Sequence, residues 1–384
     1  MRLLVDKNNP YVAEAFRDYG DVRVLGTTEF TRETVRDADA LVVRSETKVT
    51  RELLEGSRVR FVGSATIGTD HVDLDYLKRA GIGFASAPGC NANSVADYVV
   101  AALLRHASQH CTGLDGRTLG IVGVGNVGSK VALRARALGM KVLENDPPRE
   151  RTESLPHFVS LDEAMEADFV TLHVPLTREG ADATHHLFDG ERIARMKRGS
   201  VLINTARGAV VETGALKDAL RSAHLGATML DVWENEPAID TELLTMVVLG
   251  TSHIAGYSFD GKLNAVRMIH AAVGKFFNLK SSWTVPPTLP PPTVEHLTYE
   301  TAAGLDVEHA LREIVRACYD IGADDGALRT LLALEPGERA SAFRRLRAHY
   351  GVRREYLATT VRLVPDHRAL RRVLEALGFL VEFP

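Results

Sequence analysis

Along the first 92 residues, short apolar runs alternate with polar stretches and stretches of helical period. The runs cover residues 3–6, 22–25, 40–44, 60–64 and 82–86. Short runs rich in valine, leucine, isoleucine and phenylalanine are typical of strands, and their alternation with helical stretches is typical of a parallel sheet covered by helices. The pattern therefore predicts a small parallel α/β domain at the start of the chain.

The same alternation continues over residues 118–255, after a helical pattern over residues 94–110. Strands are expected at residues 119–122, 141–143, 169–174, 201–204, 229–232 and 246–249. This order predicts a Rossmann-type doubly wound parallel sheet. A helical pattern over residues 261–278 would return the chain to the first domain, so we expect the Rossmann domain to be inserted in a flavodoxin-like α/β domain.

A proline-rich segment at residues 286–292 predicts a stiff extended linker, because proline lacks an N–H donor and fixes φ. After it, a small α+β module is predicted over residues 293–384. Its strands are expected before residue 307, at residues 356–363 and at the end, and its helices at residues 307–319, 339–350 and 367–377. A module of this kind most often serves oligomerisation or regulation. Its arginines fit either an anionic ligand or a solvated helix face: Arg344, Arg345, Arg347, Arg353 and Arg354.

Three domains are therefore expected. Residues 1–92 and 257–285 would form a substrate-binding domain, residues 93–256 a nucleotide-binding domain, and residues 286–384 a C-terminal domain. The length of 384 residues supports this division, because one hydrophobic core rarely serves so long a chain.

Composition excludes several classes of protein. The net charge of −4 gives no general attraction to nucleic acid, and no apolar run approaches the length of a membrane span. The N-terminus lacks the apolar region of a signal peptide, so we expect a cytoplasmic protein. The cysteines and histidines lack metal-ligand spacing, so neither a disulfide framework nor a metal site is expected.

A glycine-rich hexapeptide, Gly123-Val124-Gly125-Asn126-Val127-Gly128, follows the apolar run at residues 119–122. Glycine lets the backbone turn from strand to helix and approach a pyrophosphate, which the helix N-terminus then binds. Asp146 closes the next strand, where a carboxylate accepts from ribose hydroxyls and repels a 2′-phosphate. A lone GxGxxG also serves ordinary helix packing, but this context favours a dinucleotide. Asp146 favours NAD over NADP, although Arg149 could weaken that preference.

Three further side chains follow successive strands of the same domain. Arg207 follows residues 201–204, Glu236 follows residues 230–233, and His253 follows residues 248–251. Because the carboxyl ends of parallel strands form the binding crevice, these side chains are expected to converge. Histidine is the best base near neutral pH, a carboxylate can orient its ring, and arginine can bind a substrate carboxylate. Taken singly, each side chain fits an ordinary structural role, so the hypothesis rests on the trio.

Asp231 and Gly256 lie in the same loops and fit two interpretations. Asp231 could contact the nicotinamide side of the cofactor or cap a loop, and Gly256 would allow close approach of the cofactor. In the first domain, Arg44-Ser45 ends a strand and Thr66 to Asp70 form a glycine-containing turn. Such a turn can present N–H groups to a carboxylate or serve only as a turn.

The fingerprint with Asp146 and the segments 204–208, 231–237 and 252–256 together resemble the D-isomer-specific 2-hydroxyacid dehydrogenases. The resemblance implies catalytic roles for Arg207 and Glu236 and makes His253 the proton acceptor. It implies cofactor contacts from Gly123, Gly125, Asn126, Val127, Gly128, Asp146, Thr205, Ala206, Arg207, Asp231 and Gly256. In His173-Val174-Pro175-Leu176 the family often has threonine where Val174 stands, so a side-chain hydroxyl contact to the cofactor is absent there.

More narrowly, the segments 43–49, 87–92, 146–148 and 250–257 look like a branch of this family that oxidises 4-phospho-D-erythronate with NAD. That resemblance implies the product 2-oxo-3-hydroxy-4-phosphobutanoate, an early step towards pyridoxal 5′-phosphate, and a homodimer joined by the C-terminal domain. Ser45, Thr66 and Tyr257 would then touch the substrate. The substrate phosphate is supplied by the resemblance alone; Arg44, Lys48 and the C-terminal arginines are candidate partners for it.

Two alternatives stay open at this point. A 3-phosphoglycerate or other D-2-hydroxyacid dehydrogenase would carry the same catalytic trio. An NAD-sensing scaffold or corepressor on the same fold would bind the cofactor without turnover.

Overall fold

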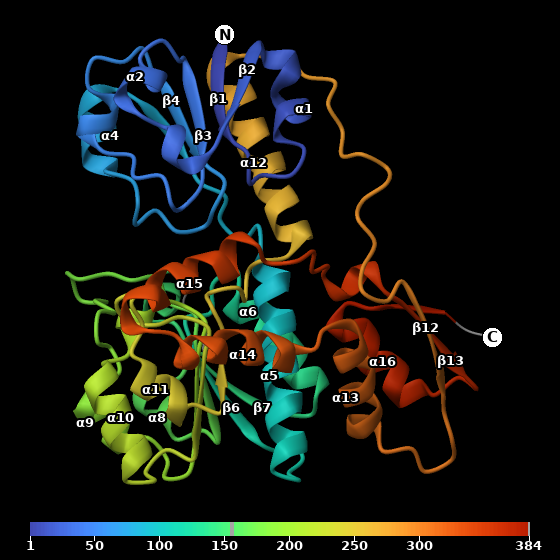
Figure 1. Ribbon diagram of the computed structural model, residues 1–384. Helices are drawn as coiled ribbons and strands as arrows, with labels where there is room; N and C mark the ends of the chain where they lie inside the picture. The colour runs from blue at the N-terminus through green and yellow to red at the C-terminus, as the bar shows by residue number, and fades with distance from the viewer. Residues whose placement is uncertain (154–156, 383–384) are drawn as a thin grey trace. The chain divides into compact units, whose positions relative to one another are not determined.

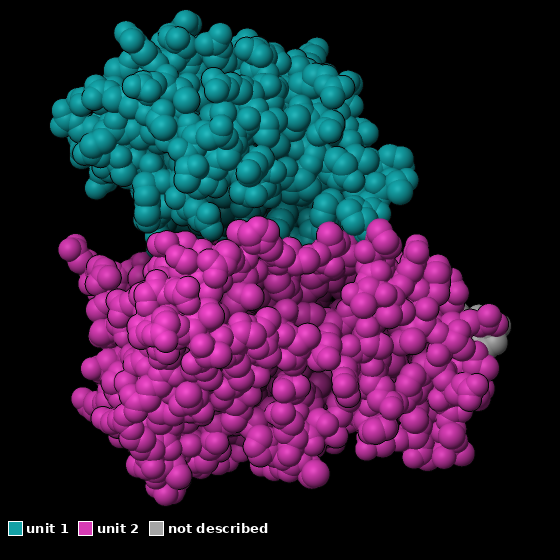
Figure 2. Space-filling model, viewed as in Figure 1, with its two compact units in different colours: residues 1–91, 257–290 teal, residues 92–256, 291–384 magenta. Residues whose placement is uncertain are grey.

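The structure is a computed structural model that describes residues 1–153 and 157–382. The chain divides into two compact units, coloured separately in Figure 2. Unit 1 comprises residues 1–91 and 257–290, and unit 2 comprises residues 92–256 and 291–384. Within the described residues, no helix is both long and apolar enough to cross a membrane.

Unit 1 is built on a five-stranded parallel sheet of order β2-β1-β3-β4-β5, which is the flavodoxin-like order. Its strands are β1 (Arg2–Asp6), β2 (Asp21–Leu25), β3 (Ala40–Val43), β4 (Phe61–Ser64) and β5 (Gly83–Ala85). Each lies within one or two residues of an apolar run. The expected parallel α/β domain is therefore confirmed.

Helices cover both faces of this sheet. On one face, Leu3 and Val5 of β1 pack with Phe16 of α1 (Val12–Phe16) and Val266 of α12 (Phe259–Phe277); Figure 1 shows these two helices side by side. Alternate residues of the same strands, such as Leu4 and Leu41, face a second core that includes residues of three short helices: α2 (Arg32–Val35), α3 (Arg51–Leu54) and α4 (Leu74–Ala80). Strands buried on both sides explain the continuous apolar runs. The remaining short turns are the 3-10 helices η1 (Arg17–Tyr19) and η2 (Thr27–Glu29).

Unit 2 contains a six-stranded parallel sheet of order β11-β10-β9-β8-β6-β7. The strands are β6 (Thr118–Val122), β7 (Lys141–Asn145), β8 (Phe169–Leu172), β9 (Val201–Asn204), β10 (Ala227–Leu230) and β11 (Leu249–Gly250). The helices are α5 (Ala92–Gln109), α6 (Gly128–Ala137), α7 (Pro147–Glu153), α8 (Leu161–Met165), α9 (Gly190–Arg195), η3 (Gly208–Val210), α10 (Thr213–Arg221) and α11 (Thr241–Met246). The strand order reverses between β6 and β8, and a doubly wound sheet binds its ligand at that point.

Two strand predictions in this sheet were misplaced. The strand expected at residues 246–249 is only Leu249–Gly250, because Asp240 caps a helix that runs to Met246. The strand expected at residues 229–232 ends at Leu230, where the Asp231 carboxylate instead accepts hydrogen bonds from the loop after β11.

The C-terminal residues of unit 2 add a parallel sheet of order β12-β13-β14. Its elements are β12 (His296–Glu300), α13 (Val307–Cys318), α14 (Ile321–Arg329), η4 (Thr330–Ala333), α15 (Pro336–Ala348), η5 (Tyr356–Ala358), β13 (Thr360–Val364), α16 (Arg368–Leu377) and β14 (Leu380–Glu382). The strand expected from residue 356 thus begins as a 3-10 turn, and α14 was not anticipated. Leu328 of α14 and Phe343 of α15 belong to the same hydrophobic core as Val122 and Leu202 of the six-stranded sheet. These two helices are therefore part of the body of unit 2.

Candidate active site

The glycine-rich loop links β6 to α6. The presence of glycine has a different explanation at each of its three glycine positions. Gly123 has φ 89°, and a Cβ there would lie 2.8 Å from the backbone of His173. A Cβ on Gly128 would collide with the carbonyl oxygen of Gly123, so α6 can pack closely only with glycine at its start. A Cβ on Gly125 would meet nothing within 4 Å. No protein atom explains the absence of a side chain there, which fits a ligand approaching the backbone.

Asp146 follows β7 and accepts two backbone hydrogen bonds. Its Oδ2 accepts from the Val124 N–H (2.8 Å) and its Oδ1 from the Arg149 N–H (3.1 Å). A carboxylate offers about four lone-pair sites, so capacity remains for ribose hydroxyls. The Arg149 guanidinium forms two 2.7 Å hydrogen bonds with Glu153 and also donates to the Val124 carbonyl. Arg149 is thus committed to protein partners rather than presented for a 2′-phosphate.

His173 links the end of β8 to the loop after β9. Its ring nitrogens lie 3.0 Å from the Thr171 hydroxyl and 3.2 Å from the Thr205 hydroxyl. Burial lowers the pKa of His173 to about 3, so the ring is neutral and bridges two hydroxyl groups. It thereby fixes the side chain of Thr205 at the carboxyl end of the sheet.

Arg207 stands in the turn after β9, and Asn204 braces that turn. The Asn204 amide donates to the Arg207 carbonyl (2.9 Å) and accepts from the Ala206 N–H (3.0 Å), while Arg207 Nη1 donates to the Ala206 carbonyl (2.8 Å). A Cβ on Gly208 would overlap the backbone of Trp233. The Arg207 turn therefore packs directly on the loop that leads to Glu236.

Asp231 organises the loop that carries His253, defined here as the His253 loop, residues 251–256. Its Oδ1 accepts from the Thr251 hydroxyl and the Ile254 N–H (both 2.7 Å), and its Oδ2 accepts from the Ala255 N–H (2.9 Å). Its carbonyl accepts from the His253 N–H at 2.7 Å. Asp231 is 1% exposed. These contacts match the interpretation of Asp231 as a residue that caps a loop.

His253 and Glu236 form a hydrogen-bonded pair at the carboxyl ends of β11 and β10. His253 Nδ1 lies 2.7 Å from Glu236 Oε2, and the other oxygen, Oε1, accepts from the Trp233 N–H at 2.8 Å. Burial would raise the pKa of Glu236, but the charge of His253, its hydrogen bond and the Trp233 N–H lower it overall. The carboxylate is therefore ionised and holds one ring nitrogen, which leaves Nε2 for a substrate proton.

The three residues expected to touch the substrate belong to unit 1 rather than unit 2. Ser45 lies in the turn after β3. The Thr66 hydroxyl lies 2.8 Å from the Ser64 hydroxyl and donates to the Gly68 carbonyl (3.2 Å). Two cations face the ring of Tyr257, with the Arg44 guanidinium 5.5 Å and the Lys262 ammonium 4.4 Å from its centroid.

The sequence did not point to two arginines of the C-terminal module as partners of the His253 loop. Arg347 Nε donates to the His253 carbonyl (3.2 Å), and Arg353 Nη2 donates to the Ala255 carbonyl. Arg353 is 7% exposed, so for this residue the solvated-face interpretation was wrong. No local spacing could have revealed these contacts, because the partners lie 94 and 98 residues apart.

Family models match two parts of the chain. Residues 92–255 match the D-isomer specific 2-hydroxyacid dehydrogenase, NAD binding domain. Residues 288–378 match a domain of unknown function (DUF3410).

Curated relatives match along the whole chain. An erythronate-4-phosphate dehydrogenase of Chromohalobacter salexigens is 45% identical over 387 residues, which cover 100% of this chain and 99% of that protein. One from Salinibacter ruber is 47% identical over 367 residues, covering 94% of each. The chain belongs to the erythronate-4-phosphate dehydrogenase family. It is an NAD-binding oxidoreductase of the 2-hydroxyacid dehydrogenase type, as the resemblance predicted.

Solved structures match the chain at the level of the fold. A D-lactate dehydrogenase from Aquifex aeolicus, complexed with NAD and lactic acid, matches with TM-score 0.60 and 29% identity over 72% of this chain and 95% of that one. The TT0316 protein from Thermus thermophilus matches with TM-score 0.63 and 31% identity over 73% and 98%. Both neighbours cover about three quarters of the chain.

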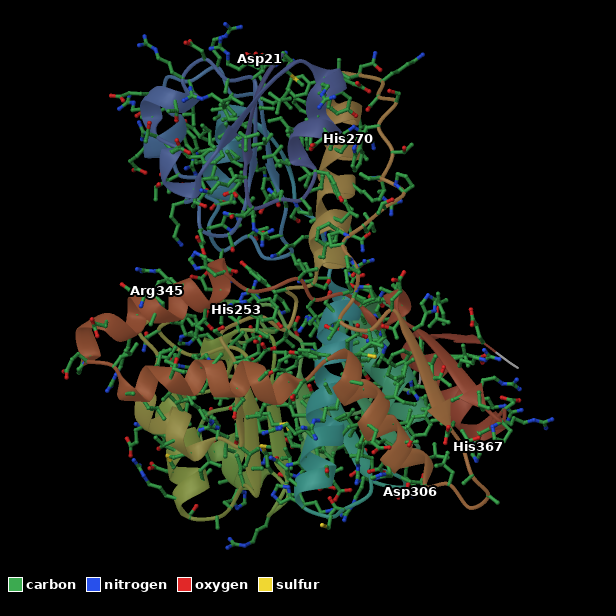
Figure 3. All side chains as sticks on the ribbon, turned by 45° about the vertical axis from the view of Figure 1, so that its right-hand side comes forward. Asp21, His253, His270, Asp306, Arg345 and His367 are labelled. Atoms are coloured by element: carbon green, nitrogen blue, oxygen red, sulfur yellow. The ribbon has the colours of Figure 1, made fainter. Side chains whose placement is uncertain are left out.

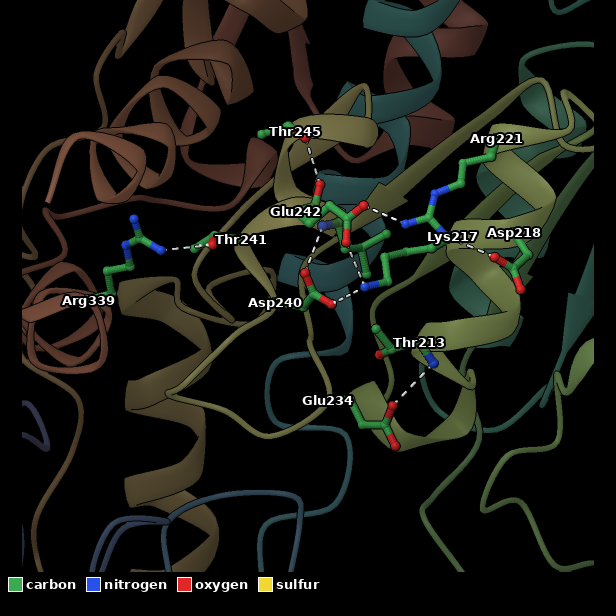
Figure 4. Close-up of polar contacts among 11 residues, drawn as sticks. Thr213, Lys217, Asp218, Arg221, Glu234, Asp240, Thr241, Glu242, Thr245 and Arg339 are labelled. Atoms are coloured by element: carbon green, nitrogen blue, oxygen red, sulfur yellow. Dashed lines mark hydrogen bonds and ion pairs between the residues drawn. The ribbon is translucent and has the colours of Figure 1, made fainter. Parts of the chain in front are cut away.

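A second set of polar contacts of this family member links helices α10 and α11 and the loop at Glu234 (Figure 4). Glu234 accepts from the Thr213 N–H (3.1 Å; Figure 4). It also pairs with His186 (2.6 Å). Lys217 of α10 binds Asp240 (2.7 Å) and Glu242 (3.0 Å) at the start of α11. Among residues 1–153 and 157–382, no group of three or more histidine, cysteine or acidic side chains is arranged to hold a metal ion.

The glycines allow a paired test of the NAD site. We expect Gly125→Ala to keep the wild-type unfolding temperature and to weaken NAD binding about 10-fold or more, because only a bound ligand meets the added methyl group. Gly128→Ala is expected to lower the unfolding temperature as well, because its methyl group collides with the Gly123 carbonyl. Thermal unfolding measures the unfolding temperature, and titration of the protein fluorescence with NAD measures the affinity. Equal NAD affinity in Gly125→Ala and wild type would remove the ligand explanation for Gly125.

Proposed function

We propose that this protein oxidises the C2 hydroxyl of 4-phospho-D-erythronate to give 2-oxo-3-hydroxy-4-phosphobutanoate, with NAD as the acceptor. The observation that carries the proposal is the His253–Glu236 pair, held at 2.7 Å at the carboxyl end of an NAD-binding sheet. The substrate is inferred from full-length relatives that bear the name erythronate-4-phosphate dehydrogenase. This assignment places the reaction in pyridoxal 5′-phosphate biosynthesis.

The residues of unit 2 divide the chemical work. The loop 123–128, Asp146 and the turn at Thr205 and Ala206 would hold NAD, which when bound accepts the hydride from C2 of the substrate. His253 Nε2 takes the hydroxyl proton, and the Glu236 carboxylate stabilises the imidazolium that forms. Arg207 binds the substrate carboxylate and polarises the forming carbonyl.

The substrate contacts of unit 1 are assigned to Ser45, Thr66 and Tyr257. Positive charge beside Tyr257 supports this assignment, because Arg44 and Lys262 both face the Tyr257 ring. Lys48 is an exposed residue of the turn after Ser45. A substrate that carries a carboxylate and a phosphate suits such surroundings.

We also propose that the protein is a homodimer joined through its C-terminal module. In support, the outer strands β12 and β14 each pair on one side only among the described residues, and Leu380 is 56% exposed. Exposed strand edges and apolar side chains are common features of interfaces. Sedimentation equilibrium should give twice the chain mass, and a monomer at all concentrations would contradict the proposal.

Substitution of Glu236 by glutamine tests the acid–base pair. The lowered pKa of Glu236 means that its stabilising interactions are present at neutral pH and are lost as the pH falls into the acid range. In Glu236→Gln the ring loses an anionic neighbour, so protonation becomes less favourable. The acidic limb of the pH profile of kcat/KM should move about 1 unit lower, and kcat should fall about 10- to 100-fold. Glu234→Gln is the matched control, and an unmoved acidic limb in Glu236→Gln would contradict this role.

The substrate assignment is tested by a panel of acids. Purified protein is assayed for NADH formation with 4-phospho-D-erythronate, 3-phosphoglycerate and D-lactate, each with and without an added 2-oxo acid that can reoxidise bound cofactor. We expect a clear preference in kcat/KM for phosphoerythronate. Preference for another acid would overturn the substrate assignment. Absence of turnover with NAD bound would favour the scaffold alternative.

A further inference from the structure

Two arginines of the C-terminal module donate hydrogen bonds to backbone carbonyl groups of the His253 loop. Arg347, on α15, donates to the His253 carbonyl (3.2 Å), and Arg353 donates to the Ala255 carbonyl. Asp231 binds the N–H groups of the same two residues. Its carbonyl accepts from the His253 N–H, and its carboxylate accepts from the Ala255 N–H. Both hydrogen-bonding edges of the loop are therefore held. Figure 3 labels His253 in its loop and Arg345 on the neighbouring helix α15.

The loop needs this support because its backbone is strained at the catalytic residue. His253 has φ 58°, in the left-handed region that favours glycine. A residue other than glycine is disfavoured in such sparsely populated conformations and persists there only when its surroundings fix it. The direction of the ring towards Glu236 depends on this backbone conformation. Groups that bind the carbonyl at this point therefore act on the orientation of the ring.

Further contacts anchor the segment that carries these two arginines. The guanidinium of Arg353 also stacks 4.6 Å from the Tyr319 ring centroid. Helices α14 and α15 also bind the chain that leads into the loop. From α14, Asp325 accepts from the Gly250 N–H (2.8 Å), and Arg329 donates to the Leu244 and Val247 carbonyls (2.9 Å each). From α15, Arg339 donates to the Thr241 hydroxyl (2.9 Å; Figure 4). The segment that carries Arg347 and Arg353 is thus anchored before and beside the catalytic residue.

The charge of Arg347 is also felt by the catalytic pair. The pKa of Glu236, which burial would raise, is lowered by His253, by the Trp233 N–H and also by Arg347. Another charged group at this loop is the buried carboxylate of Asp231. Arg347 therefore favours the ionised Glu236 carboxylate, and its loss would favour proton uptake by the pair.

We propose that Arg347 and Arg353 are positioning residues of the dehydrogenase reaction, through which residues 321–354 of the C-terminal module hold the catalytic histidine in its working orientation. This inference rests on the proposed role of His253 as the proton acceptor. It gives the module a role in the chemistry of its own chain, in addition to any role in assembly. No part of it requires a second copy of the chain, because both contacts lie within one protomer.

The test compares Arg347→Gln, Arg347→Lys and the control Arg344→Gln, which changes an exposed arginine of the same helix. Loss of a hydrogen bond to a charged group should lower kcat of Arg347→Gln about 10-fold, with little change in the KM for NAD. The acidic limb of its kcat/KM profile should move to higher pH, opposite to Glu236→Gln. Arg347→Lys keeps the charge, so it should keep the wild-type profile and recover part of kcat. A purely structural arginine would shift neither the profile nor kcat selectively.

Two further measurements keep the test decisive. Titration of the His253 ring by NMR, with His253→Ala for assignment, should show a midpoint at higher pH in Arg347→Gln than in wild type, whichever acid the enzyme oxidises. Arg353→Lys, which preserves the buried charge, should fold and should lower kcat more than the KM for NAD. An unchanged titration and unchanged kcat in Arg347→Gln would overturn the proposal. If wild type prefers an acid other than phosphoerythronate, only the substrate assignment fails, and the variants are compared on that acid.

Discussion

Replacement of His253 by alanine should lower kcat for phosphoerythronate oxidation by about 10³-fold, within the range that positioned acid–base groups contribute. The reason is the proposed role of His253 Nε2 as the proton acceptor, with Glu236 bound to the other ring nitrogen. NAD binding should be retained, because the glycine loop and Asp146 lie on other strands of the sheet. Steady-state kinetics and NAD fluorescence titration measure the two quantities.

His309→Ala is the matched control for this variant. His309 is an exposed residue of α13 paired with Glu313 at 3.7 Å, and its loss should leave kcat unchanged. A His253→Ala enzyme with kcat within a few-fold of wild type would show that another group accepts the proton. Loss of NAD binding in the same variant would show that the loop has a structural role for the cofactor site.

Asp231→Asn should produce the second large effect, on stability and on activity together. The buried Asp231 carboxylate accepts from the Thr251 hydroxyl and from the Ile254 and Ala255 N–H groups. An asparagine turns an N–H₂ group towards at least one of these donors, and each buried unsatisfied donor costs about 1–3 kcal/mol. The free energy of unfolding should fall by that amount, and kcat should fall about 10- to 100-fold because the loop holds the catalytic ring.

Chemical denaturation and steady-state kinetics check this prediction, with Asp218→Asn as the control. Asp218 is an exposed residue that pairs with Arg221 on the same helix, where a surface ion pair contributes little. If Asp231→Asn matches wild type in both stability and kcat, the carboxylate does not organise the His253 loop.

The central strands of the five- and six-stranded sheets could be predicted because they are buried on two faces. Residues 201–204, for example, coincide with the fully buried strand β9. Residues 22–25 nearly coincide with β2, an edge strand that is mostly exposed but still carries an apolar run. Apolar pattern alone could not separate a short strand from the apolar turn that precedes it, so Val247 and Val248 were assigned to a strand that begins only at Leu249. Helix α14 escaped notice because Gly322 and Gly326 weaken its helical pattern and few of its residues are buried apolar side chains.

Part of the candidate site could be predicted from its place in the sheet. Arg207, Glu236 and His253 follow the strands β9, β10 and β11, and the structure joins the last two by a hydrogen bond of 2.7 Å. The support of the loop by Arg347 and Arg353 could not be predicted. It depends on the packing of α14 and α15 into the hydrophobic core of unit 2, and no sequence period reports such a long-range contact.

The central claim is that this chain moves the hydrogen at C2 of 4-phospho-D-erythronate to NAD. The most direct measurement uses substrate deuterated at C2 and follows the label by mass spectrometry. The account predicts deuterium in the NADH that forms or, when a 2-oxo acid reoxidises bound cofactor, in the 2-hydroxy acid made from it. Unlabelled products, or no products while NAD is bound, would contradict the claim.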